Sequence, residues 1–212
     1  MTLVRRAAAA VSVVLALTAA AGCSEDTPRQ DGPVVLQPGE AGEGNKRVDP
    51  DQVEPPADEF NDVDREFVEM MVPHHHQAVL MAELAKTRAK NEQVAGFAQR
   101  IGDTQKAEID VLQAWLAARD LPKAALTPSG EHATHMAGML TPEQLDELAA
   151  AKGTAFDKLF VERMIAHHQG AVAMADRALG DGIEAINRAF AGDVAASQTA
   201  EIERLRQIQK TL

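Results

Sequence analysis

One stretch of the sequence occurs twice, and this duplication constrains the fold more than any other feature. The 16 residues from Phe67 to Ala82 recur, 93 positions later, from Phe160 to Ala175. The matched residues include Met71 and Met164, His74 and His167, His75 and His168, and Met81 and Met174. We therefore predict an all-α, pseudo-symmetric four-helix bundle built from a duplicated two-helix unit, at about 60–119 and 153–212, with a connection at 120–152.

Capping residues mark the first two helices. Apolar side chains in this region recur at helical and not at alternating spacing, so we expect helices and no strand. The first helix is predicted at about 60–88, with Asp58 or Asn61 as its cap. The second helix is predicted to follow the cap Asn91 and to continue to about Arg119.

The second half begins with a capping signal. The stretch from Thr141 to Gln144 has a threonine N-cap, a proline at the first helical position and a glutamine at the third. The pattern predicts a helix that bends or restarts at Lys152 and Gly153 and ends near Gly182. The last helix is predicted from about Ile183 to near the end of the chain.

The first 59 residues have a different composition from the rest. Residues 1–22 combine two arginines with a short apolar run, which is typical of a secretory signal. Cys23 follows a sequence like a bacterial lipobox, so we expect lipidation there and an anchor outside the cytoplasmic membrane; an ordinary signal with an incidental cysteine is the alternative. Residues 23–59 are rich in Pro, Gly and acidic residues and predict a disordered tether to a metal-binding domain at 60–212.

Composition narrows the function. The net charge is −11, there is no tyrosine, and Trp115 is the single tryptophan. An acidic chain with so few aromatic side chains does not suit a nucleic-acid partner. Cys23 is the only cysteine, so no intrachain disulfide can form.

Helical geometry places two histidines of each copy on the inward face. At 100° per residue, His74 and His75 flank the apolar stripe that contains Met71, whereas His76 points outward. The second copy has a glutamine at the position of His76. Adjacent histidines diverge, so we expect a site to collect ligands from both repeats across the pseudo-two-fold axis.

The partner helices carry polar residues on the same inward stripe. Gln105 and Glu108 lie there in the first repeat, and Gln198 and Glu201 occupy the matching positions in the second. A carboxylate that faces a core is costly unless it is paired or bound to a metal. Both glutamates are therefore predicted to bind metal directly or to accept the second N–H of a ligand histidine.

The predicted ligands favour copper over other metals. Imidazole and thioether donors suit copper, including Cu(I), and the lack of thiolates argues against a structural zinc site; another transition metal is an alternative. The primary set is His74, His75, His167, His168, Met71, Met81, Met164, Met174, Glu108 and Glu201. A lower-ranked accessory set in the connection is His132, His135, Met136 and Met139.

The doubled motif resembles a secreted bacterial family, the domain of unknown function 305. The resemblance lies in Phe67 to Ala82, in Phe160 to Ala175 and in the run from Met139 to Leu145, and it covers nearly all of 60–212. It implies a ferritin-like four-helix bundle that is exported or lipid-anchored. For some members it also implies periplasmic copper binding linked to copper tolerance, and the motif's His and Met positions match the primary set.

Three functions fit these observations. The first is an extracytoplasmic lipoprotein that sequesters or buffers copper inside the bundle. The second is a ferritin-like di-metal oxidase, which is less favoured because the helices lack the Glu-x-x-His pairs and the several carboxylates of such centres. The third is a structural or interaction module whose inward polar residues pair with one another and bind no metal.

Overall fold

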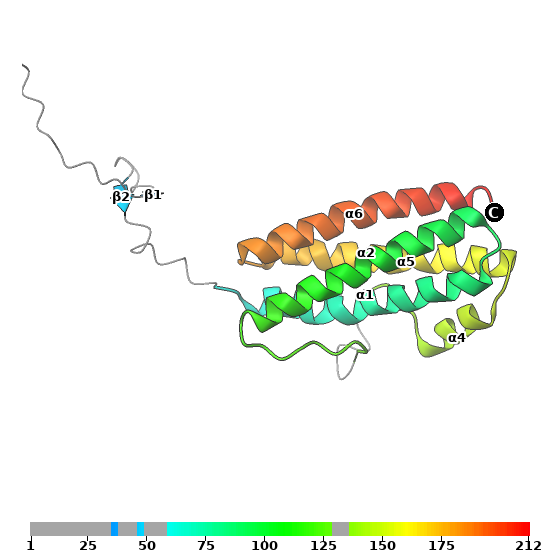
Figure 1. Cartoon of the computed structure of the whole chain (residues 1–212), viewed down its shortest axis with the longest axis horizontal. Coiled ribbons are helices and arrows are strands. Elements are labelled where there is room, and N and C mark those ends of the chain that lie inside the picture. The colour runs from blue at the N-terminus through cyan, green and yellow to red at the C-terminus, as the bar shows by residue number, and fades with distance from the viewer. Residues whose placement is uncertain (1–34, 38–45, 49–58, 129–135) are drawn as a thin grey trace, which may run out of the picture. The chain divides into compact units, whose positions relative to one another are not determined.

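The computed structural model describes residues 35–37, 46–48, 59–128 and 136–212. The chain divides into two compact units, Met1–Glu54 and Pro55–Leu212. Figure 1 shows the helices of the second unit. No helix in the described ranges is long and apolar enough to cross a membrane. The predicted signal and Cys23 lie outside the described residues.

The first unit contains two short strands that the sequence analysis did not expect. Strand β1 (Val35–Gln37) pairs with strand β2 (Lys46–Val48) in antiparallel register. Valine occupies one position in each strand, and these two valines are directly opposite each other. Each strand has only three residues, which is too short for a periodicity-based prediction to detect.

The first repeat forms a helical hairpin close to the predicted limits. Helix α1 (Asp62–Arg88) is capped by Asn61 through a reciprocal capping box with Asp64. Helix α2 (Glu92–Ala117) is capped by Asn91, whose side chain accepts from the second and third backbone N–H groups. Pro73 lies within α1, which continues as a helix on both sides of it.

The second repeat forms the matching hairpin. The capping box at Thr141 and Gln144 begins a short helix, α4 (Pro142–Ala150), as predicted. The chain restarts at Gly153, whose positive φ of 63° suits glycine, and continues as α5 (Thr154–Asp181). Helix α6 (Ala185–Gln209) completes the four long helices, so the predicted all-α bundle of two duplicated hairpins is confirmed.

The two hairpins meet mainly through their first helices. Helix α1 packs against α2, α5 packs against α6, and α1 also packs against α5, as Figure 1 shows. The buried apolar side chains form two clusters. One contains Met81, Phe160 and Met164, and the other contains Met71 and Leu112. The four inward histidines are also fully buried, so the interior contains polar as well as apolar side chains.

Two buried aspartates hold the repeats together in a reciprocal way. Asp64 of α1 accepts hydrogen bonds from the backbone N–H groups of Ile183 and Glu184, at the start of α6. Asp157 of α5 accepts from the backbone N–H groups of Lys90 and Asn91, at the start of α2. The two aspartates are separated by the same 93 positions as the histidines. Each repeat therefore binds the interhelical turn of the other.

The Asp64 end of the bundle carries an extended polar network. Asn187 donates to both the carboxylate and the backbone carbonyl of Asp64. Glu184 caps α6, accepts from the indole of Trp115 at 3.2 Å and lies 3.3 Å from Arg119. Burial by itself raises the pKa of Asp64, but hydrogen bonds from Asn61, Asn187 and the backbone N–H groups of Ile183 and Glu184 outweigh burial and lower the pKa.

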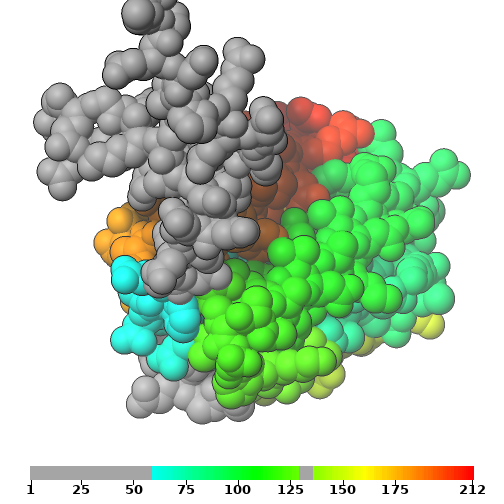
Figure 2. Space-filling model, turned by 60° about the vertical axis from the view of Figure 1, so that its left-hand side comes forward, coloured from blue at the N-terminus to red at the C-terminus, as the bar shows by residue number. Residues whose placement is uncertain are grey.

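Figure 2 views this end of the bundle, where α1 begins, α2 ends and α6 begins.

Replacing Asp64 by Ala should destabilise the protein by about 3 kcal/mol, because several buried donors lose their acceptor. The unfolding free energy from urea titration measures this. Asp103→Ala is the matched control, since Asp103 lies on the outer surface of α2, and it should change stability by less than about 0.5 kcal/mol. Equal effects of the two substitutions would contradict the capping role.

Candidate metal centre

Two histidines from different repeats meet in the middle of the bundle. His74 of α1 and His167 of α5 are fully buried, and their ring centroids lie 3.8 Å apart with an interplanar angle of 38°. The Nε2 atom of His74 lies 3.2 Å from the backbone carbonyl oxygen of Ala137, which can only accept. The two copies of the motif therefore converge across the pseudo-two-fold axis, as expected.

The other two buried histidines each contact a glutamate of the partner helix. His168 Nε2 lies 2.7 Å from Glu201 Oε2, and His75 Nε2 lies 2.8 Å from Glu108 Oε2. The first contact is aligned as a hydrogen bond, whereas the second is within ion-pair distance without that alignment. Both carboxylates keep about a fifth of their side-chain surface exposed. Each therefore connects a buried imidazole to solvent.

These contacts assign roles to the ring nitrogens. A carboxylate or carbonyl oxygen accepts, so the Nε2 atom beside it carries the proton and the Nδ1 atom keeps its lone pair. This holds for His74 and His168, whose contacts are aligned as hydrogen bonds. Among the described residues, the Nδ1 atoms of His74, His75 and His168 have no hydrogen-bond partner, and neither nitrogen of His167 has one.

Two amides extend the set of unpartnered polar atoms. Gln105 and Gln198 are each 2% exposed, and both polar atoms of each side chain lack a hydrogen-bond partner in the described parts of the chain. They lie one helical turn from Glu108 and Glu201, on the same faces of α2 and α6. A buried polar group without a partner costs about 1–3 kcal/mol, so this region favours a bound polar species.

The central histidines are neutral. Burial, followed by the nearby His75, lowers the pKa of His74 to about 3, although the Ala137 carbonyl opposes the shift. Burial, followed by the nearby His74, lowers the pKa of His167 well below the ordinary value. A neutral ring explains how the two imidazoles can lie so close without repulsion. It is also the form of histidine that binds metals.

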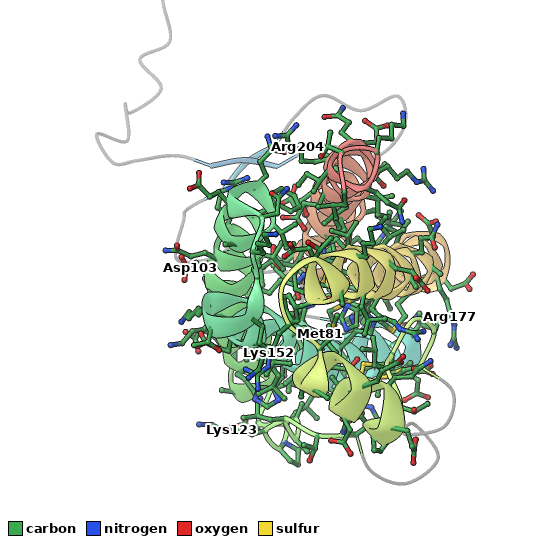
Figure 3. All side chains as sticks on the ribbon, turned by 90° about the vertical axis from the view of Figure 1, so that its right-hand side faces the viewer. Met81, Asp103, Lys123, Lys152, Arg177 and Arg204 are labelled. Atoms are coloured by element: carbon green, nitrogen blue, oxygen red, sulfur yellow. The ribbon has the colours of Figure 1, made fainter. Side chains whose placement is uncertain are left out.

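The four motif methionines do not have equivalent surroundings. Met71 and Met164 are fully buried and belong to opposite apolar clusters. Met81 is also fully buried, and Figure 3 labels it in the bundle interior. Met174, its counterpart, is only partly buried and lines a small hollow with Met70 and Arg177. The helical angles predicted equivalent positions for Met81 and Met174, so the two repeats are less symmetric at this pair.

The histidines are close but do not form a ready-made cage. Among the described residues, no three His, Asp, Glu or Cys side chains are arranged to hold one metal ion. Methionine is not among these four residue types, so the thioethers of the motif are not included. Of the accessory residues, Met136 is buried and Met139 is partly buried, whereas His132 and His135 lie outside the described residues.

A tight turn lies against the central histidines; sequence reasoning placed Met136 and Met139 of this segment in the accessory metal set but did not predict its contact with His74. Ala137 and Gly138 lie in this turn, and Gly138 has a positive φ of 77°. A Cβ atom on Gly170 would overlap the Ala137 carbonyl, so only glycine fits there. Gln77, at the matching position of the first repeat, instead exchanges two hydrogen bonds with the backbone of Leu140. The replacement of Gln77 by Gly170 at the matching position was the one sequence difference that could have indicated this turn.

Comparison with known proteins agrees with this arrangement. The family described as Domain of unknown function (DUF305) matches residues 64–209. The chain belongs to the DUF305 family. The matched segment includes nearly all of the four long helices, the doubled histidine motif and the turn at Ala137 and Gly138. No curated protein matches the sequence.

Several solved structures resemble this DUF305 chain. A DUF305 protein from Streptomyces coelicolor, named as a secreted protein, is 27% identical, with a TM-score of 0.63 over 69% of this chain and 91% of that one. A DUF305 fragment from Deinococcus radiodurans is 27% identical, with a TM-score of 0.65 over 72% and 98%. CopM in its Cu(II)-bound form is 30% identical, with a TM-score of 0.60 over 70% and 96%. CopM structures also include Cu(I)-bound and Ag-bound forms.

The metal-free protein should lose stability as the pH falls below about 6.5, because the unfolded histidines take up protons while buried His74 and His167 stay neutral. The loss should approach about 1.4 kcal/mol per pH unit for each histidine. Urea unfolding between pH 7 and pH 5 measures it. In a His74→Gln/His167→Gln variant the slope should flatten, and an unchanged slope would contradict the assignment.

Proposed function

We propose that this DUF305 protein is an extracytoplasmic metal-binding lipoprotein that sequesters copper in the polar region of its bundle. The observation that carries the proposal is the cluster of four fully buried histidines with unpartnered ring nitrogens, contributed by both repeats. An internally paired polar core would leave few such atoms, so the cluster argues against a metal-free structural module. The copper-bound and silver-bound forms of CopM support the choice of metal.

The histidines would bind through Nδ1. In His74 the Nε2 atom faces the Ala137 carbonyl, and in His75 and His168 it faces a glutamate. These contacts occupy the Nε2 side of each ring, so the unpartnered Nδ1 atom would be the one available to a metal. Met71 and Met164, buried in the same bundle, would add soft thioether donors. Imidazole and thioether together suit Cu(I), which accepts fewer ligands than most divalent ions.

The glutamates would act by orienting histidines. Each carboxylate contacts Nε2 of a buried imidazole and retains partial exposure, so it can hold the ring and balance charge near the solvent boundary. With one glutamate per repeat on these inward faces, the carboxylates are too few to bridge a di-metal oxidase centre. A copper buffer therefore fits better than an oxidase, and the protein should show no sustained oxygen consumption with Fe(II) or Cu(I).

The proposed localisation is based on the sequence of residues 1–59. A secretory signal at residues 1–22 and lipidation at Cys23 would place the domain outside the cytoplasmic membrane. The secreted relative supports export. A tether at 23–59 would let the bundle reach metal at a distance from the lipid surface. Mass spectrometry of the membrane fraction, with and without Cys23→Ala, tests the anchor.

Replacing the central pair should abolish tight binding. His74→Gln/His167→Gln removes one donor from each repeat, and anaerobic Cu(I) titration against a competing chelator should show loss of the high-affinity site. Copper should raise the melting temperature of the unsubstituted protein by several degrees and that of the variant by clearly less. His132→Gln/His135→Gln is the control and should retain tight binding. Wild-type affinity in the His74/His167 variant would refute the proposal.

Removing an orienting carboxylate should weaken binding without eliminating it. Glu108→Gln and Glu201→Gln should each lower Cu(I) affinity by about 10- to 100-fold. Glu203→Gln serves as the control, because Glu203 lies exposed on the same helix as Glu201. Affinity that is unaffected by both site substitutions would show that the glutamates neither orient nor bind.

A further inference from the structure

A groove lies outside the buried histidine cluster, on another side of α1. It has a volume of about 570 Å³ and is formed by α1, by residues 126–128, by the segment before α4 and by the start of α4. His76, Met136 and Met139 all line it. His76 points away from the bundle axis, as its helical angle predicted, but it faces this groove and is only partly exposed.

The two methionines occupy the corners of one turn. The backbone N–H of Met139 donates to the carbonyl of Met136 at 3.3 Å, and Gly138 between them has a φ of 77°. These are the features of a type II turn, which brings its first and fourth Cα atoms within about 7 Å. The backbone therefore holds Met136 and Met139 close together at one side of the groove.

The turn is pressed tightly against α5. A Cβ atom on Gly138 would lie 2.5 Å from the carbonyl oxygen of Ala166. A Cβ atom on Gly170 would overlap the carbonyl group of Ala137. Leu140 is fixed to Gln77 by hydrogen bonds of 2.7 and 2.9 Å. The backbone that carries the two methionines is therefore fixed against α1 and α5.

We propose that His76, Met136 and Met139 form a second site for a soft monovalent cation, Cu(I), in this groove. One imidazole and two thioethers are a soft donor set. Among the described residues, His76 makes no hydrogen bond that would compete for its ring nitrogens. The identity of the metal rests on the proposed function, whereas the donor set is separate from the buried cluster.

The same turn connects this site to the buried one. Its methionine side chains line the groove, while the carbonyl of Ala137, between them, faces Nε2 of His74 at 3.2 Å. One short backbone segment therefore separates the two donor sets. The groove site is placed to capture Cu(I) from solvent before the ion passes to the buried histidines.

Anaerobic Cu(I) titration of the purified protein against a competing chelator tests the proposal by the number of ions bound. Met136→Leu/Met139→Leu keeps the apolar packing and removes both thioethers, and His76→Gln removes the imidazole at a partly exposed position. Met70→Leu, on the same helix but outside the groove, is the control. Circular dichroism and melting temperature verify that each variant is folded.

Each groove variant should bind one Cu(I) fewer than the unsubstituted protein, whereas Met70→Leu should bind the full number. His74→Gln/His167→Gln should retain the groove ion. Full stoichiometry in both groove variants, or loss of the ion only in His132→Gln/His135→Gln, would overturn the inference and leave the proposed function intact. Loss of copper in the groove variants with none lost in the His74/His167 variant would support the groove site and refute the proposed function.

Discussion

The removal of four imidazoles from water is the constraint on which this structure depends. The rings are fully buried between helices, and several of their nitrogens have no partner in the described chain. Burial keeps the central rings neutral, and a neutral imidazole with a free lone pair is a metal ligand. The cost of burying such groups is acceptable if a bound ion offsets it. Under the proposed function, stability and metal binding are therefore coupled at the same side chains.

The histidines can meet because the two repeats hold each other at their ends. Asp64 binds the turn that begins α6, and Asp157 binds the turn that begins α2. Each carboxylate satisfies backbone N–H groups that a helix start leaves unpaired. Because the contacts are reciprocal, they set the register between α1 and α5. That register brings His74 and His167 to a centroid distance of 3.8 Å.

The two repeats are not symmetric where the turn before α4 contacts them, and this turn contributes polar backbone groups to the interior. A single turn before α4 lies across both repeats. It binds Gln77 in the first repeat, whereas Gly170 leaves space for it in the second. A strictly repeated sequence could not accommodate one turn in this way. The turn also supplies the carbonyl that contacts His74. The asymmetry of this duplicated bundle therefore comes from the connection together with the residues of α1 and α5 that contact it.

Much of this architecture was readable from the sequence. The 93-residue duplication, the caps Asn61 and Asn91, and the capping box at Thr141 are local patterns, and a helical period suffices to place His74 and His75 inward. The short strands were missed because three residues carry too little periodicity. The tertiary structure alone decided which histidines meet, how the aspartates cross between repeats, and where the turn before α4 lies. A sequence period specifies an angle about one helix axis, but contacts between helices depend on their relative rotation and offset, which only packing determines.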